Sequence, residues 1–211
     1  MTAAAYRWRW VGLLAVLAAS LMNLLDATVV NIAAPTIRRD LGGSYADLQW
    51  LTAGYTLAMA LGLLAGGRLG DMFGRKRMLL LGAAGFTLAS LACALAPSEG
   101  VLIVARIAQG LIGAVMVPQG FGLIRDMFPP QDVGKAFGVF GPAIGIATIL
   151  GPVVAGFLIR LDGWRLIFLI NVPLGLAAMP QKSLRINGRW RHNHADDRGS
   201  DRAVQRGLPA A

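Results

Sequence analysis

Apolar residues along the chain fall into six blocks that are separated by short polar segments. A helix needs about 20 apolar residues to cross the roughly 30 Å hydrocarbon core of a bilayer, and most of the blocks approach that length. Because lipid offers no hydrogen-bond partner to an open backbone, each block is expected to be an α-helix. The pattern predicts an all-α integral membrane protein. The predicted spans are Val11–Ile32, Leu48–Gly67, Met78–Ala96, Val101–Ile124, Phe137–Ile159 and Leu166–Met179.

The sixth block differs from the others in its length and in the segment that comes after it. Its 14 residues reach only about 21 Å as a helix, which is short of the bilayer core. The composition changes abruptly at Pro180, and the tail is rich in Arg, Asp, His and Gly without apolar periodicity. We therefore expect a bundle over residues 1–179 and a basic, disordered tail over 180–211. The tail is either a native segment near anionic lipid headgroups or an out-of-frame extension.

Composition supports a membrane protein and argues against a soluble one. Hydrophobic residues make up 55% of the chain and charged residues 15%, whereas soluble domains carry about 25% charged residues. The 27 glycines and 10 prolines are typical of membrane helices, whose neighbours compensate for broken hydrogen bonds. The net charge of +9 does not indicate nucleic-acid binding, because the cations lie between apolar blocks or in the tail.

The distribution of Lys and Arg among the short loops predicts the orientation of the chain. Eight cations lie on one predicted side and four on the other before the tail begins. The N-terminus is therefore expected in the cytoplasm, with the protein multi-pass in the cell membrane. The richer side holds Arg7, Arg9, Arg68, Arg75, Lys76, Arg77, Arg125 and Lys135, and the other holds Arg38, Arg39, Arg160 and Arg165.

The most specific motif is the loop between the second and third predicted spans, Gly67-Arg-Leu-Gly-Asp-Met-Phe-Gly-Arg-Lys-Arg77. It resembles the signature that members of the major facilitator superfamily carry at this place. The resemblance implies a six-helix N-terminal bundle and a cytoplasmic gating loop, in which Asp71 and Arg75 hold one state shut and Gly67 lets helices approach closely. The alternative is a basic loop with turn glycines. The loop residues concerned are Gly67, Asp71, Gly74, Arg75, Lys76 and Arg77.

Two charged residues within predicted spans are candidates for proton coupling. A charge in the membrane is costly and marks a functional site by default. Asp26 lies in a segment that resembles the first-helix signature of fourteen-span drug–proton antiporters, and Arg106 lies in one that resembles the family's arginine signature. Burial disfavours the charged form of Asp26, so a proton could bind there. Alternatively, Asp26 is purely structural and Arg106 snorkels to an interface. By the same resemblance, Asn31 and Gln109 are candidates to line the substrate cavity.

The fifth span combines small residues with prolines, which bend a helix and allow close packing. The pattern resembles the antiporter signature of the family, which is associated with export, although its usual final Gly-Gly is Ala155-Gly156 here. The alternative is a generic glycine-packed helix. The signature residues are Gly141, Pro142, Gly145, Gly151, Pro152 and Gly156. The entry to the sixth span, residues 163–173, resembles the same drug exporters, and Trp164 also suits a membrane interface.

Taken together, the resemblance implies half of a transporter that exports small amphipathic molecules or drugs against proton entry. We expect no enzyme activity, no cofactor beyond the proton gradient as energy source, and no metal site, since His192 and His194 lack a second pair of ligands. The partners are the lipid bilayer, a small-molecule substrate, and either a C-terminal half or a second copy of the chain. The rival hypothesis is a truncated or frameshifted fragment of such an exporter that transports nothing.

Overall fold

The computed structural model describes residues 9–178, so the predicted disordered tail and Arg7 lie outside the described residues. All seven elements in this range are helices, which confirms the expected all-α fold. Five of them are long and apolar enough to cross a membrane. The expected short sixth helix is present as two pieces separated at Ile170. The helices are α1 (Arg9–Leu41), α2 (Tyr45–Phe73), α3 (Arg75–Ala94), α4 (Glu99–Met127), α5 (Pro130–Asp162), α6 (Leu166–Leu169) and α7 (Asn171–Ala178).

Local sequence signals set the helix ends. Ser44 caps α2, because its hydroxyl accepts a hydrogen bond from the Asp47 backbone while the Asp47 carboxylate accepts one from the Ser44 backbone. Gly74 separates α2 from α3 with a φ of 95°, and Gly163 ends α5 with a φ of 79°. Both values lie where glycine is strongly favoured. Pro130 opens α5 at a position where its missing N–H is not needed.

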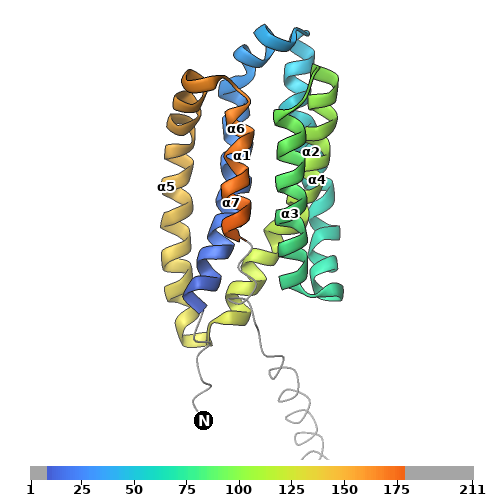
Figure 1. The fold of residues 1–211 in the computed structure, drawn as a ribbon. Helices are drawn as coiled ribbons and strands as arrows, with labels where there is room; N and C mark the ends of the chain where they lie inside the picture. Colours follow the sequence, from blue (N-terminus) through green and yellow to red (C-terminus); the bar gives the residue numbers. More distant parts are fainter. Residues whose placement is uncertain (1–8, 179–211) are drawn as a thin grey trace, which may run out of the picture.

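In Figure 1, α1, α5, α6 and α7 lie on one side and α2 and α3 on the other, while α4 begins beside α2 and crosses to the α5 side at its C-terminal end. The α2–α4 contact is the most extensive, and glycines make it close. A Cβ at Gly66 would collide with the carbonyl oxygen of Ala114, and one at Gly70 would collide with the side chain of Gln119. At Gly67 a Cβ would lie 4.0 Å from the Pro118 side chain. The close approach of α2 to α4 that was expected at Gly67 therefore occurs at Gly66 and Gly70.

Buried apolar side chains form two clusters, one toward each end of the bundle. One includes Leu13, Met22, Phe86 and Leu123, near the α2–α3 connection. The other includes Val29, Leu51, Leu102, Trp164 and Phe168, near the α1–α2 connection. The residues between them along α1, α3 and α4 are polar and buried, and they form the candidate site.

Candidate proton-coupling site and substrate cavity

Asp26 of α1 and Arg106 of α4 form an ion pair at the centre of the bundle. Both are buried, with 2% and 0% of the residue exposed. The guanidinium of Arg106 therefore lies in the bundle interior rather than at an interface, where the alternative would place it. Truncating one partner of a buried pair leaves an uncompensated charge and costs about 3–5 kcal/mol. The two charges therefore hold α1 and α4 together only while both are present.

Two further amides donate hydrogen bonds to the Asp26 carboxylate. Gln109 Nε2 and Asn171 Nδ2 each lie 3.0 Å from Asp26 Oδ1. The same two amide nitrogens donate to Ser90 Oγ, at 2.7 Å from Gln109 and 3.0 Å from Asn171. The Asp26 carboxylate thus joins α1 to α4 and α7, and the two amides extend the network to Ser90 of α3; all four side chains are buried.

Arg106 has acceptors besides Asp26. Its Nη1 donates to Gln109 Oε1 at 2.8 Å, and its Nε donates to the Leu51 carbonyl at 3.4 Å. The guanidinium also lies over the Tyr55 ring, 4.1 Å from the ring centroid, an arrangement that stabilises a buried cation. Arginine stays protonated in proteins. These additional partners would keep Arg106 accommodated if Asp26 became neutral.

Three members of this network were not identified from the sequence: Tyr55, Ser90 and Asn171. Ser90 and Asn171 are each an isolated polar residue in an apolar stretch, and Tyr55 lies between two threonines of a predicted span. Ordinary lipid-facing or packing residues show the same patterns. Among the uncharged members of the network, only Gln109 could be placed beside Arg106 from the sequence. It lies three residues after Arg106 and therefore on the same helix face. For the others, only the packing of helices distant in sequence reveals the contact.

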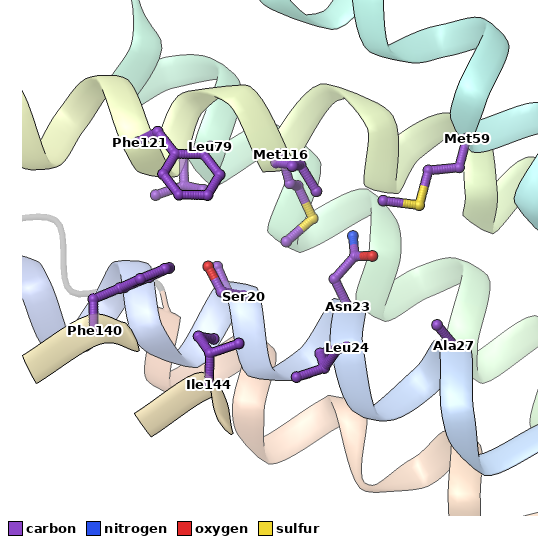
Figure 2. A pocket seen from close by; sticks show the side chains of 12 residues that line it. Ser20, Asn23, Leu24, Ala27, Met59, Leu79, Met116, Phe121, Phe140 and Ile144 are labelled. Carbon is purple, nitrogen blue, oxygen red and sulfur yellow. The ribbon is translucent and has the colours of Figure 1, made fainter. Parts of the chain in front are cut away.

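A cavity of about 260 Å³ lies next to this network and is lined by residues of α1, α2, α3, α4 and α5 (Figure 2). Its walls are mostly apolar and include sulfur and aromatic side chains. Asn23, one helical turn before Asp26, adds an amide whose Oδ1 accepts a hydrogen bond from the Tyr55 hydroxyl at 2.9 Å. The lining residues are Ala19, Ser20, Asn23, Leu24, Ala27, Met59, Leu79, Met116, Val117, Phe121, Phe140 and Ile144.

The two sequence-based cavity candidates lie elsewhere. Gln109 is completely buried in the Asp26 network, and Asn31 is exposed on α1 with its Oδ1 accepting from Thr52 at 3.0 Å. Neither is among the residues that line the cavity described above. Their contact with a substrate stays a prediction.

The α2–α3 connection gathers the charges of the predicted gating loop. Arg75 Nη2 donates to Asp71 Oδ1 at 3.2 Å, and its Nη1 lies 3.4 Å from Asp126 Oδ2 at the end of α4. Arg75 thereby links α2 to α4, and the outer part of its side chain, guanidinium included, lies against Gly122. Asp71 is exposed, and Arg77 is exposed while Lys76 is half-buried.

The glycines of the fifth helix face open space rather than a neighbour within the described residues. A Cβ at Gly141, Gly145 or Gly156 would meet no atom within 4 Å, and Pro142 and Pro152 are exposed. Gly151 is different, because a Cβ there would lie 3.0 Å from Thr28 Oγ1 on α1. Only part of the signature therefore packs inside this bundle.

Trp164 does not lie at an exposed interface. It is completely buried beside Phe168, and its indole nitrogen donates to Asp40 Oδ2 at 3.1 Å. The contact fastens the α5–α6 connection to the end of α1. Among the described residues, no group of three or more potential ligands could hold a metal ion, and the two tail histidines lie outside that range.

The chain matches the family described as "Major Facilitator Superfamily" over residues 16–205. It is 55% identical over 178 residues to the probable actinorhodin transporter of Streptomyces coelicolor, covering 82% of this chain and 31% of the relative. It is 45% identical to the tetracenomycin C resistance and export protein of Streptomyces glaucescens, covering 81% of this chain and 32% of that protein. The chain thus spans about a third of the length of these curated relatives.

Solved structures share the fold at low sequence identity. The inward open xylose transporter XylE from E. coli superimposes with a TM-score of 0.72 at 20% identity, covering 86% of this chain and 49% of that one. A peptide transporter named POT gives a TM-score of 0.72 at 17% identity, covering 92% of this chain and 44% of that one. The described helices therefore correspond to just under half of a complete transporter fold.

Proposed function

The chain belongs to the major facilitator superfamily, and from this membership we propose that it forms the N-terminal half of a proton-coupled exporter of small amphipathic molecules. The observation that carries the proposal is the buried Asp26–Arg106 pair next to a mostly apolar cavity. The named antibiotic transporters among its relatives support a substrate of this class. No cofactor is invoked, because the proton gradient supplies the energy.

Proton coupling is assigned to Asp26 and Arg106. A proton on Asp26 would remove the charge that holds Arg106 and so weaken the contact between α1 and α4. Arg106 would keep Gln109, the Leu51 carbonyl and the Tyr55 ring. The protein would then have two arrangements of the same side chains, and substrate and proton would bias the balance between them.

Gating is assigned to the loop that carries Asp71 and Arg75, whose exposed ion pairs can exchange partners at little cost. The cations gathered near this loop favour its placement in the cytoplasm, together with the N-terminus. Bacterial relatives favour the cell membrane as the location.

A second bundle is the expected partner. Substrate sites in such transporters lie between two repeats that rock against each other. The open glycine face of α5 (Gly141, Gly145 and Gly156) supports a partner on that side, because small residues allow close helix contact in membranes. That partner is either a C-terminal half or a second copy of the chain.

The proposal is tested by dye movement in proteoliposomes that contain the full chain, with ethidium as the probe and an imposed pH gradient as the driving force. We expect gradient-dependent movement for the unmodified chain, its loss in Asp26→Asn, and its retention in Asp47→Asn, which removes a surface carboxylate instead. Unaltered movement in Asp26→Asn would remove that residue from the mechanism. Absence of any gradient-dependent movement by the unmodified chain would favour the rival, non-transporting fragment.

A further inference from the structure

Asn171 is the first residue of α7. The nitrogen of its side-chain amide is hydrogen-bonded, and the oxygen is not. Its Nδ2 donates to Asp26 Oδ1 and to Ser90 Oγ, both at 3.0 Å. Its Oδ1 is buried and makes no hydrogen bond. The residue as a whole is completely buried. A buried carbonyl oxygen without a donor is costly and calls for an explanation.

The neighbouring carboxyl group of Asp26 could supply the hydrogen-bond donor that Asn171 Oδ1 lacks. An ionised carboxylate only accepts hydrogen bonds, so the Asn171 amide must present its nitrogen to Asp26 in that state. A protonated Asp26 would carry an O–H that needs a buried acceptor. The nearest amide oxygen on α4, Gln109 Oε1, is already engaged by Arg106 at 2.8 Å. The unused oxygen of Asn171 is the acceptor that remains.

We propose that Asn171 is a positioning residue for the proton on Asp26, and that its amide turns over when Asp26 changes protonation state. The inference rests on the proposed function, which makes Asp26 the proton site. In the ionised state the amide nitrogen faces Asp26 and Ser90, as described. In the protonated state a half-turn about the terminal side-chain torsion places the amide oxygen in the same position. That torsion is broad for asparagine and needs no backbone movement.

The Asp26 carboxyl group has hydrogen-bond partners in both states, while the unpartnered end of the Asn171 amide changes from its oxygen to its nitrogen. A proton from water binds Asp26 Oδ1, and that O–H donates to Asn171 Oδ1. The Ser90 hydroxyl, which can donate as well as accept, donates to the same oxygen. Gln109 Nε2 keeps its bond to Ser90 Oγ. The ionisable groups around Asp26 are Arg106 on α4, Tyr55 on α2 and Cys93 on α3, and none of them is required to gain or lose a proton.

The direct test is pH-difference infrared spectroscopy of the full chain in lipid nanodiscs, with carbon-13 in the side-chain carbonyl of asparagine. A carboxylic-acid band that Asp26→Asn removes reports the proton on Asp26. The labelled carbonyl band that Asn171→Leu removes reports the amide. We expect the amide band to move to lower frequency in step with the acid band, because the oxygen gains two hydrogen bonds. An acid band that appears without any change in the amide band would overturn the proposal, and so would the absence of an Asp26 acid band.

The pH midpoint of the acid band gives a second readout that a purely structural role would not produce. A fixed donor stabilises only the carboxylate, so its loss in Asn171→Leu would raise the midpoint by about one to two pH units. A reversible amide stabilises both states, so we expect a shift below about half a unit. Gln109→Leu is the matched comparison, because Arg106 fixes the orientation of Gln109, and there the larger upward shift is expected. These readouts need no transport, so failure here is distinct from failure of dye movement.

Discussion

Replacing Asp26 with Leu should destabilise the bundle strongly, and a second substitution at Arg106 should recover much of the loss. The single change leaves the Arg106 guanidinium buried without a countercharge, which costs about 3–5 kcal/mol. Gln109 Oε1 and the Leu51 carbonyl remain as its acceptors, so we expect the lower end, about 3 kcal/mol. In Asp26→Leu/Arg106→Met the charge is gone. The two amides that faced Asp26 keep Ser90 as a partner, so the expected loss is about 1 kcal/mol.

The measurement is thermal unfolding of the chain in nanodiscs, and the labelling of Cys93 by a thiol reagent is the readout. This is the chain's single cysteine, it is buried, and it becomes reactive only when the bundle opens. For a chain of this size, each kcal/mol moves the unfolding temperature by about 2–4 °C. The single variant should therefore unfold about 6–12 °C lower, and the double variant about 2–4 °C lower. Equal unfolding temperatures for the single variant and the unmodified chain, or losses that simply add in the double variant, would refute the reasoning.

Three further substitutions test the packing and the charged loop. Gly66→Val should lower the free energy of unfolding by about 3 kcal/mol, because it forces α2 away from the α4 backbone, whereas Gly67→Ala should be neutral or slightly stabilising. Both are read by thermal unfolding, and equal effects would contradict the assigned contact. Arg75→Ala should change stability by less than about 1 kcal/mol in the same assay, because its ion pairs are exposed. Tyr55→Phe should cost about 1–2 kcal/mol by removing the donor to Asn23 while leaving the ring over the guanidinium; an unchanged stability would show that this bond contributes nothing.

The apolar blocks were sufficient to predict the helices and their order, since lipid allows few alternatives for such segments. They underestimated the length of α1, which continues from the predicted end at Ile32 to Leu41. Hydropathy does not register the polar turns that continue a helix beyond the bilayer core. The break at Ile170 was likewise not predicted, although Pro173, which has no N–H to donate to the Leu169 carbonyl, follows three residues later.

The sequence predicted the two charged residues of the candidate site but not the uncharged residues that surround them. Asp26 and Arg106 were identified because a charge within an apolar block is conspicuous, and the structure brings them together. Ser90 and Asn171 carry no such signal. Their contact with Asp26 depends on how α3 and α7 pack against α1, which is a property of three dimensions. The same reason explains Gly67: the motif marks the correct turn of helix, while the face that meets α4 belongs to Gly66 and Gly70.

The Asp26 network also has a consequence for the order in which the bundle is assembled during synthesis. Asp26, Ser90 and Arg106 all leave the ribosome before Asn171, which comes 145 residues after Asp26. Until α7 arrives, the central carboxylate lacks one of its donors and Ser90 lacks another. Docking of α7 therefore completes the hydrogen bonds of the polar centre during biogenesis. A nascent chain stalled before Asn171 would present an incomplete polar centre to the membrane insertion and quality-control machinery.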